Sequence, residues 1–115
     1  MKVLVHHIYE YKKGVRNLVL HTLPAILLEE AERKLRQQGI EYVVRPINAT
    51  RVNIFFGEPE CVDVIREIGD KKLNEFTPEE DFMLGIMLGY DRVKQCKRYL
   101  RQRGQKTAFL PPLIG

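Results

Sequence analysis

Histidine and cysteine are the residue types in this chain that could carry chemistry. His6 and His7 are adjacent, and His21 is distant from both. Adjacent side chains point in different directions in a strand and in a helix, so such a pair rarely binds one metal ion. His7 and Glu10 would share a helix face, as paired metal ligands do. Because zinc sites need three or four ligands at recognisable spacing, we expect no metal site.

The two cysteines have different sequence surroundings. Cys96 lies among basic residues, which would lower its pKa and raise its reactivity. It also lies with Val93 and Leu100 at helical spacing, which favours a buried structural cysteine. Cys61 lies on a second apolar stripe. Two cysteines are too few for a disulfide framework, so we expect both thiols to be reduced and structural.

No motif of a known enzyme class is present. The chain has no Walker phosphate-binding loop, no G-x-G-x-x-G fingerprint and no serine nucleophile elbow. We therefore assign no catalytic residue and no cofactor, and we favour a non-enzymatic protein. A small-molecule sensor or minor enzyme, with a pocket near His6, His7 and the sheet, is an alternative.

Charge is distributed unevenly along the chain. The formal net charge is +4, and seven Lys or Arg residues follow Asp91 with no Asp or Glu. The other 91 residues carry 12 basic and 15 acidic side chains. A near-neutral to acidic body that ends in a basic segment indicates an acidic or polyanionic partner, although a solvated helix face has the same composition.

Residues 76–100, FTPEEDFMLGIMLGYDRVKQCKRYL, contain the strongest local signals. Thr77 and Glu80 form a capping box around Pro78, which predicts the start of a helix. The helix is then apolar on more than one side, which favours burial against a second subunit, and its two glycines four residues apart would let another backbone approach. The predicted homodimer interface consists of Phe82, Leu84, Gly85, Met87, Leu88 and Gly89.

The segment that follows predicts a basic helix capped by Asp91. Its narrow apolar seam and broad cationic face suit docking to an acidic protein, and nucleic-acid binding by the same helix is the alternative. The predicted partner-binding residues are Lys94, Lys97, Arg98 and Arg101. In the apolar tail, we expect Phe109 and Leu110 to pack on the domain or on a neighbouring subunit.

Periodicity predicts an α+β fold. Residues 4–13 fit a helix or one arm of a hairpin. The strands are predicted at 16–22, 41–47 and 52–57, and the helices at 24–38, beginning at Pro24, and at 59–68. The resulting β-α-β-β-α core is like a ferredoxin-like split unit with a helical C-terminal extension. We expect the third strand to lie between the other two, and both helices of the core to cover one face.

Length and hydropathy limit the protein class. The 115 residues suit one domain, 1–115, with the basic helix and tail at 92–115. No apolar run approaches the roughly 20 residues that a membrane span needs. The first residues do not resemble a signal peptide, so we expect a cytoplasmic protein.

Three segments carry a resemblance: HHIYEYKKGVRNLVLHT, NIFFGEPECV and TPEEDFMLGIMLGYDRVKQCKRYL. Together they are similar to a small family of bacterial proteins defined by a domain of unknown function. The resemblance implies a three-stranded sheet with about five helices, a homodimer, and a helix at residues 4–13. It also suggests a flavodoxin as the acidic partner, because genes of such proteins often lie beside flavodoxin genes. No activity or site residue is carried over.

Overall fold

A computed structural model of the protein describes residues 1–106, so Phe109 and Leu110 lie outside the described residues. The strands are β1 (Leu18–Pro24), β2 (Glu41–Pro46) and β3 (Arg51–Gly57). The α-helices are α1 (Lys2–Lys12), α2 (Leu28–Gln37), α3 (Pro59–Ile68), α4 (Pro78–Met87) and α5 (Arg92–Lys106). Two short 3-10 helices, η1 (Ala25–Leu27) and η2 (Leu73–Glu75), precede α2 and α4. The fold is therefore α+β, as predicted.

The sheet has the strand order β1-β3-β2. Both outer strands pair antiparallel with β3, so β1 and β2 run in the same direction on either side of it. The prediction that the third strand is central is confirmed. The pairing of β2 with β3 follows from the short hairpin between them, in which Asn48 accepts hydrogen bonds from the backbone of Thr50 and Arg51.

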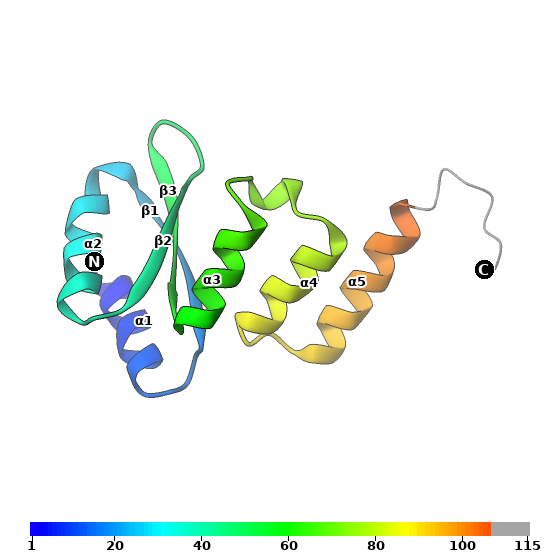
Figure 1. Ribbon diagram of the computed structural model, residues 1–115, viewed down its shortest axis with the longest axis horizontal. Coiled ribbons are helices and arrows are strands. Elements are labelled where there is room, and N and C mark those ends of the chain that lie inside the picture. The colour runs from blue at the N-terminus through cyan, green and yellow to red at the C-terminus, as the bar shows by residue number, and fades with distance from the viewer. Residues whose placement is uncertain (107–115) are drawn as a thin grey trace.

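Each face of the sheet has its own core. Val19, Ile54 and Phe56 pack with Ala31 and Leu35 of α2 on one face. On the other face, the second core joins the sheet to α3 and α4 through Leu18, Phe55, Val62, Ile65, Leu84 and Leu88. The expectation that helices 24–38 and 59–68 share one face is wrong, because successive strand residues point to opposite faces and each helix packs on a different set. Figure 1 shows α1 and α2 on one side of the sheet and α3 on the other.

The first segment is a helix and not a hairpin arm. Leu4 and Ile8, one helical turn apart, are both buried in the first core. A hairpin would have paired this segment with β1. In the structure β1 pairs instead with β3, along its whole length. The helical interpretation of residues 4–13 is thereby confirmed.

Pro24 ends a strand and does not begin a helix. Its backbone is extended, with φ −60° and ψ 139°, and it lies opposite Arg51 in the sheet. The next residue, Ala25, donates its backbone N–H to the Thr50 carbonyl at 2.7 Å. Because this bond prolongs the β1–β3 pairing, regular α-helix begins only at Leu28.

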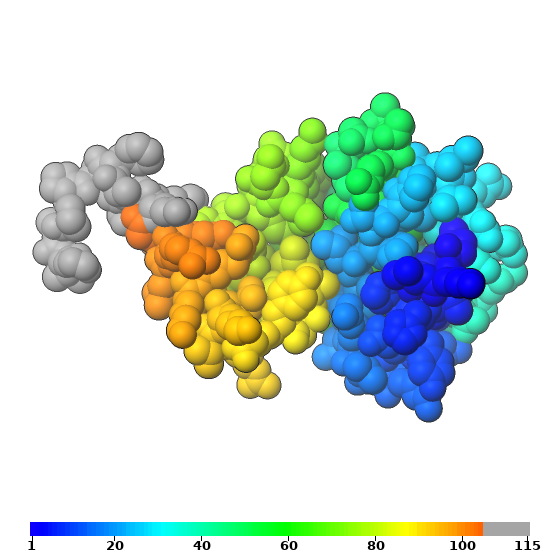
Figure 2. All heavy atoms as spheres, turned by 180° about the vertical axis from the view of Figure 1, so that it is seen from behind, coloured from blue at the N-terminus to red at the C-terminus, as the bar shows by residue number. Residues whose placement is uncertain are grey.

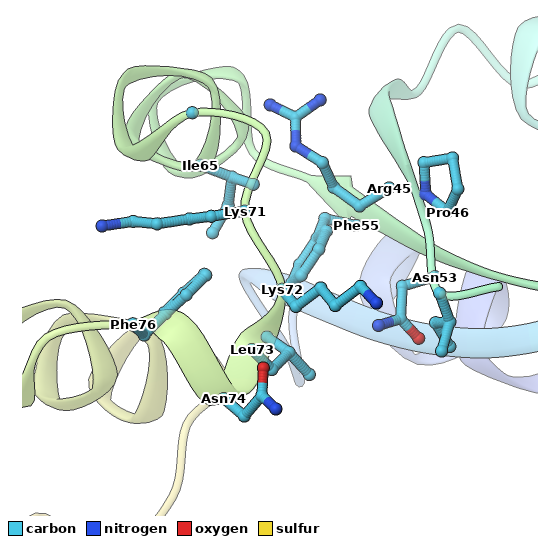
Figure 3. Close-up of a pocket in the computed structure, with 12 residues that line it drawn as sticks. Arg45, Pro46, Asn53, Phe55, Ile65, Lys71, Lys72, Leu73, Asn74 and Phe76 are labelled. Carbon is cyan, nitrogen blue, oxygen red and sulfur yellow. The ribbon is translucent and has the colours of Figure 1, made fainter.

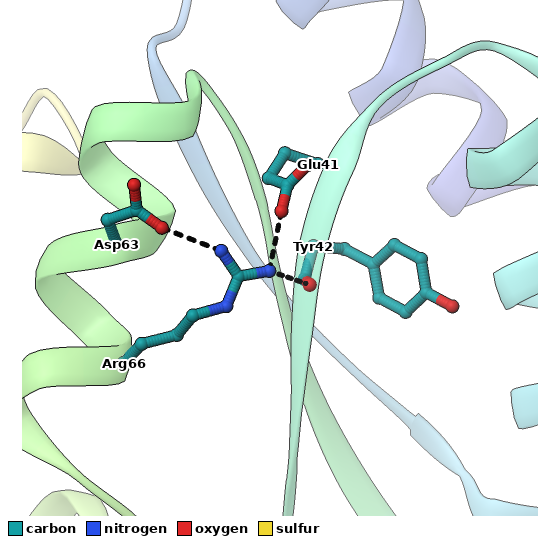
Figure 4. Close-up of polar contacts among 4 residues, drawn as sticks. All are labelled: Glu41, Tyr42, Asp63 and Arg66. Atoms are coloured by element: carbon teal, nitrogen blue, oxygen red, sulfur yellow. Dashed lines mark hydrogen bonds and ion pairs between the residues drawn. The ribbon is translucent and has the colours of Figure 1, made fainter.

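Arg66 joins α3 to the edge of the sheet (Figure 4). Its guanidinium lies 2.6 Å from the Glu41 carboxylate and 2.7 Å from Asp63, and it donates to the Tyr42 carbonyl at 3.0 Å. The hydrogen bonds that Arg66 donates to Glu41 and Asp63 raise its pKa above the usual value. These contacts hold α3 over β2 at one end and leave the other end of that sheet face to a loop.

The last two helices extend the molecule away from the sheet. α4 packs on the second core and α5 packs chiefly on α4. The molecule consequently measures 54 × 32 × 23 Å, and Figure 2 shows the two helices as a lobe beside the sheet region. Among the described residues, no helix has the length and apolar content that would span a membrane.

Candidate functional site

The turn before α4 fixes where that helix starts. Thr77 Oγ1 accepts a hydrogen bond from the Glu80 backbone N–H at 3.1 Å, and the Glu80 carboxylate accepts one from the Thr77 N–H at 2.9 Å. The predicted capping box is therefore confirmed. Lys71, 2.6 Å from the same carboxylate, and the Thr77 N–H lower the pKa of Glu80. The cap places Glu79 and Asp81 in the first turn, where they meet α5.

α4 packs against its own chain on two sides. Leu84 and Leu88 are each 7% exposed and face the second core. Gly85 is buried, and a Cβ atom there would collide with the side-chain amide of Gln95 on α5. Gly89, with φ 82°, ends the helix in the left-handed region that glycine adopts without strain. Close packing of α4 against α5 thus gives Gly85 a structural role inside one chain.

Polar contacts hold α5 against α4. Asp91 caps α5 by accepting from the Lys94 backbone N–H at 2.8 Å. Arg98 makes two bonds to Asp81, at 2.7 and 3.0 Å, and these raise the pKa of Arg98. The Tyr99 hydroxyl donates to Glu79 at 3.0 Å, which raises the pKa of Tyr99, and its ring lies 5.5 Å from that of Phe82. The acidic first turn of α4 therefore binds the side of α5 that faces it.

This packing leaves the apolar row of α5 uncovered. Val93 is 64% exposed, Leu100 is 66% exposed, and Cys96 between them is also exposed. The prediction that Cys96 is buried is wrong, because Gln95, Arg98 and Tyr99, and not the apolar row, face α4. Cys61 is half-buried on α3. Its pKa is raised mainly by burial and, to a smaller extent, by the negative charges of Glu58 and Glu60.

A groove runs between the exposed sides of the two helices. It encloses about 490 Å³ and is lined by Glu79, Phe82, Met83, Cys96, Tyr99 and Leu100. Met83 and Ile86 continue the exposed apolar surface along α4, at 41% and 37% exposure. We call this groove, together with Val93 and the basic row described next, the docking surface.

The basic row lies next to the apolar row on α5. Lys94, Lys97 and Arg101 follow helical spacing of three and four residues and are exposed. None of the three side chains forms an ion pair with any part of the chain that the structure describes. Arg98, the fourth predicted docking residue, is already paired with Asp81, although its side chain is 49% exposed.

The predicted dimer residues are divided between the interior and the surface. Leu84, Gly85 and Leu88 are buried in their own chain, whereas Phe82 and Met87 are half-buried. Met83 and Ile86, which are not in the predicted set, are exposed on the same helix, since the sequence does not show which side of an apolar helix its own core covers. The homodimer stays a prediction.

The histidines gather at the other end of the molecule. The rings of His7 and His21 are 5.5 Å apart, and burial, followed by the charge of His7, lowers the pKa of His21. Glu10 lies 3.4 Å from His7 and 3.7 Å from His6. Within residues 1–106, no group of three or more His, Cys, Asp or Glu side chains is placed to hold a metal ion.

The sequence matches the family described as "Protein of unknown function (DUF2023)" over residues 2–102. The chain belongs to the DUF2023 family. No curated protein matches it. Because the DUF2023 match includes α4 and most of α5, the helical pair that carries the docking surface is part of the DUF2023 unit and not an appendage to it.

Proposed function

We propose that this DUF2023 protein is a non-enzymatic accessory protein that binds an acidic protein partner through its docking surface. The observation that carries the proposal is that exposed apolar side chains, Val93, Cys96 and Leu100, lie directly beside three exposed cations without ion pairs to described residues. An apolar centre with a polar, solvent-accessible rim is the usual anatomy of a protein interface.

Folding stability does not account for this surface. A basic row on one helix face carries mutual repulsion, and exposed ion pairs contribute only about 0–1 kcal/mol even where they form. Arg98 and Asp81 already attach α5 to α4, so Lys97 and Arg101 are not needed for that contact. Their position on the outer side of α5 leaves them available for a carboxylate-bearing partner.

The partner expected from this chemistry presents carboxylates beside an apolar ridge that enters the groove. Long-range attraction would mainly accelerate association, and binding would weaken as salt screens charges beyond about 8 Å. Flavodoxins are acidic proteins, and the family resemblance suggests them, so a flavodoxin is the first partner to test.

The test compares charge reversals that alter the net charge equally. Lys97→Glu with Arg101→Glu should slow association with flavodoxin about tenfold or more at low salt, measured by stopped flow or surface plasmon resonance. Arg33→Glu with Arg51→Glu makes the same change in net charge on α2 and β3, at exposed sites. We expect this control to slow association much less.

Two outcomes would contradict the proposal. Equal association rates for the two double variants would show that only net charge matters. Failure of flavodoxin to bind, combined with binding of random single-stranded RNA that falls steeply with salt, would replace the protein partner with nucleic acid. Circular dichroism of each variant shows that the fold is retained.

A further inference from the structure

A second cleft lies on the sheet face that α3 covers only in part. α3 ends at Ile68, and the loop from Gly69 to Phe76 then passes beside the exposed end of β2 and β3. The space between them has a volume of about 370 Å³, within the range of about 300–1,000 Å³ typical of small-molecule sites. Figure 3 shows side chains from β2, β3, α3 and this loop around it.

The floor and one wall of the cleft are apolar. Phe55 and Ile65 are each 1% exposed and form its base, and Phe76 and Leu73 belong to the loop wall. Leu73 is 40% exposed, so part of this wall faces solvent. A surface of this kind suits the body of a ligand of about one or two rings, which would remove apolar area from water.

A row of polar side chains crosses the sheet at the cleft, and two of them, Arg45 and Asn53, line it. Thr22, Asn53 and Arg45 lie opposite one another across β1, β3 and β2. Asn53 is 6% exposed, and its side-chain oxygen accepts from the Thr22 hydroxyl at 2.6 Å. Its amide nitrogen makes no hydrogen bond within the described residues and is turned toward the Lys72 side of the cleft in Figure 3. That nitrogen is a donor available to a ligand.

The charged residues of the lining are all basic: Arg45, Lys71 and Lys72, with no Asp or Glu among the lining residues. Glu80 lies 2.6 Å from Lys71, whereas neither Arg45 nor Lys72 forms an ion pair in the described part of the chain. Arg45 is half-buried, and its Nη1 donates to the Val44 carbonyl at 3.3 Å, whereas its buried Nε makes no hydrogen bond within the described residues. A buried N–H without an acceptor is unfavourable, and a bound anion would relieve it.

We propose that this cleft binds a small carboxylate with an apolar, ring-sized body. The apolar base holds the body, and the carboxylate lies between Arg45 and Lys72 with the Asn53 amide as a further donor. A planar guanidinium suits the two coplanar oxygens of a carboxylate. The site is separate from the docking surface, and the inference does not depend on the proposed function.

The test uses 2-naphthoate, its neutral analogue 2-naphthamide, and acetate as probes of the full-length protein. In ¹H–¹⁵N spectra, 2-naphthoate should shift the backbone amides of Arg45, Ile47 and residues 53–55 and 69–76. Lys72→Met, at an exposed position, should weaken the binding of 2-naphthoate about tenfold. It should weaken the binding of 2-naphthamide much less, because only the anion makes a charge-assisted contact. Arg45→Met should act in the same direction, and Lys2→Met, at an exposed position on α1, is the matched control.

Several results would overturn the inference. One is equal affinity for 2-naphthoate and 2-naphthamide, and another is a shift pattern confined to residues 79–100. Absence of 2-naphthoate binding at millimolar concentration is a third. Acetate binding as tight as that of 2-naphthoate would show that the apolar base contributes nothing. Lys72→Met should leave flavodoxin association unchanged, so failure of this inference is distinguishable from failure of the docking proposal.

Discussion

At the scale of single residues, Gly85 and Gln95 determine how closely α4 and α5 approach. A Cβ atom at position 85 would displace the Gln95 side chain. We therefore expect Gly85→Ala to destabilise the protein by about 1 kcal/mol, since overpacking outweighs the gain in helix propensity. In a Gln95→Ala background the same change should instead stabilise by about 0.5–1 kcal/mol, because alanine favours helix over glycine. Urea unfolding of the four proteins measures both values, and the same sign in both backgrounds would contradict the packing role.

The two thiols should differ in reactivity. Cys96 is exposed in the groove, whereas Cys61 is half-buried with a raised pKa, so less of Cys61 is thiolate near pH 8. We expect iodoacetamide to label Cys96 well before Cys61, as followed by peptide mass spectrometry. A bound partner should protect Cys96 and leave Cys61 unchanged. Protection of neither thiol in a formed complex would place the partner away from the groove.

At the scale of elements, the cap of α4 should make stability depend on pH. The folded-state pKa of Glu80 is lowered, so its contribution is full above the unfolded value of about 4.5 and is lost as pH falls through the folded value. Glu80→Gln should therefore be less stable than the wild type at pH 7, and the difference should shrink as pH falls below the unfolded value. Urea midpoints between pH 3 and 7 measure this. Glu67→Gln on α3, which forms no ion pair with a described residue, is the control that should show no such trend.

The elements that sequence predicts correctly are those specified by neighbours in the chain. The Thr77–Glu80 capping box and the β2–β3 hairpin depend on side chains within a few residues. The face on which α3 packs and the side of α5 that meets α4 depend on contacts between distant residues, such as Arg98 with Asp81. Cys96 was misplaced for this reason: an apolar row usually faces inward, but here ion pairs attach the opposite side of the helix.

The two candidate sites likewise differ in whether the local sequence predicts them. The exposed basic residues Lys94, Lys97 and Arg101 were predictable from local charge, since no acidic residue follows Asp91. The cleft beside Asn53 was not, because its lining comes from β2, β3, α3 and the loop before α4. No periodic pattern joins Arg45 to Lys72, and only the packing of α3 on the sheet brings them to one space.

At the scale of the whole molecule, the predicted homodimer and the proposed acidic partner would use the same surface of the α4–α5 lobe. The radius of gyration is 16.2 Å, larger than the roughly 13 Å typical of a compact domain of 100 residues, because α5 projects beyond the core. A second copy that covered Met83 and Ile86 would form the predicted homodimer through the surface that we assign to an acidic partner. The two assemblies should therefore exclude each other.

Salt should affect these two assemblies in opposite directions. A twofold contact at the groove would bring the Lys97 and Arg101 rows of both copies together, so screening should tighten the homodimer. The complex with an acidic partner should weaken under the same conditions. Sedimentation velocity at micromolar protein and about 50 and 500 mM salt measures both equilibria. Ile86→Glu should shift the homodimer to monomer, and Ile26→Glu, at an 89% exposed apolar site away from α4, should not. A wild type that is monomeric at both salt concentrations would refute the homodimer, and a homodimer lost only with Ile26→Glu would place its interface at the sheet end of the molecule.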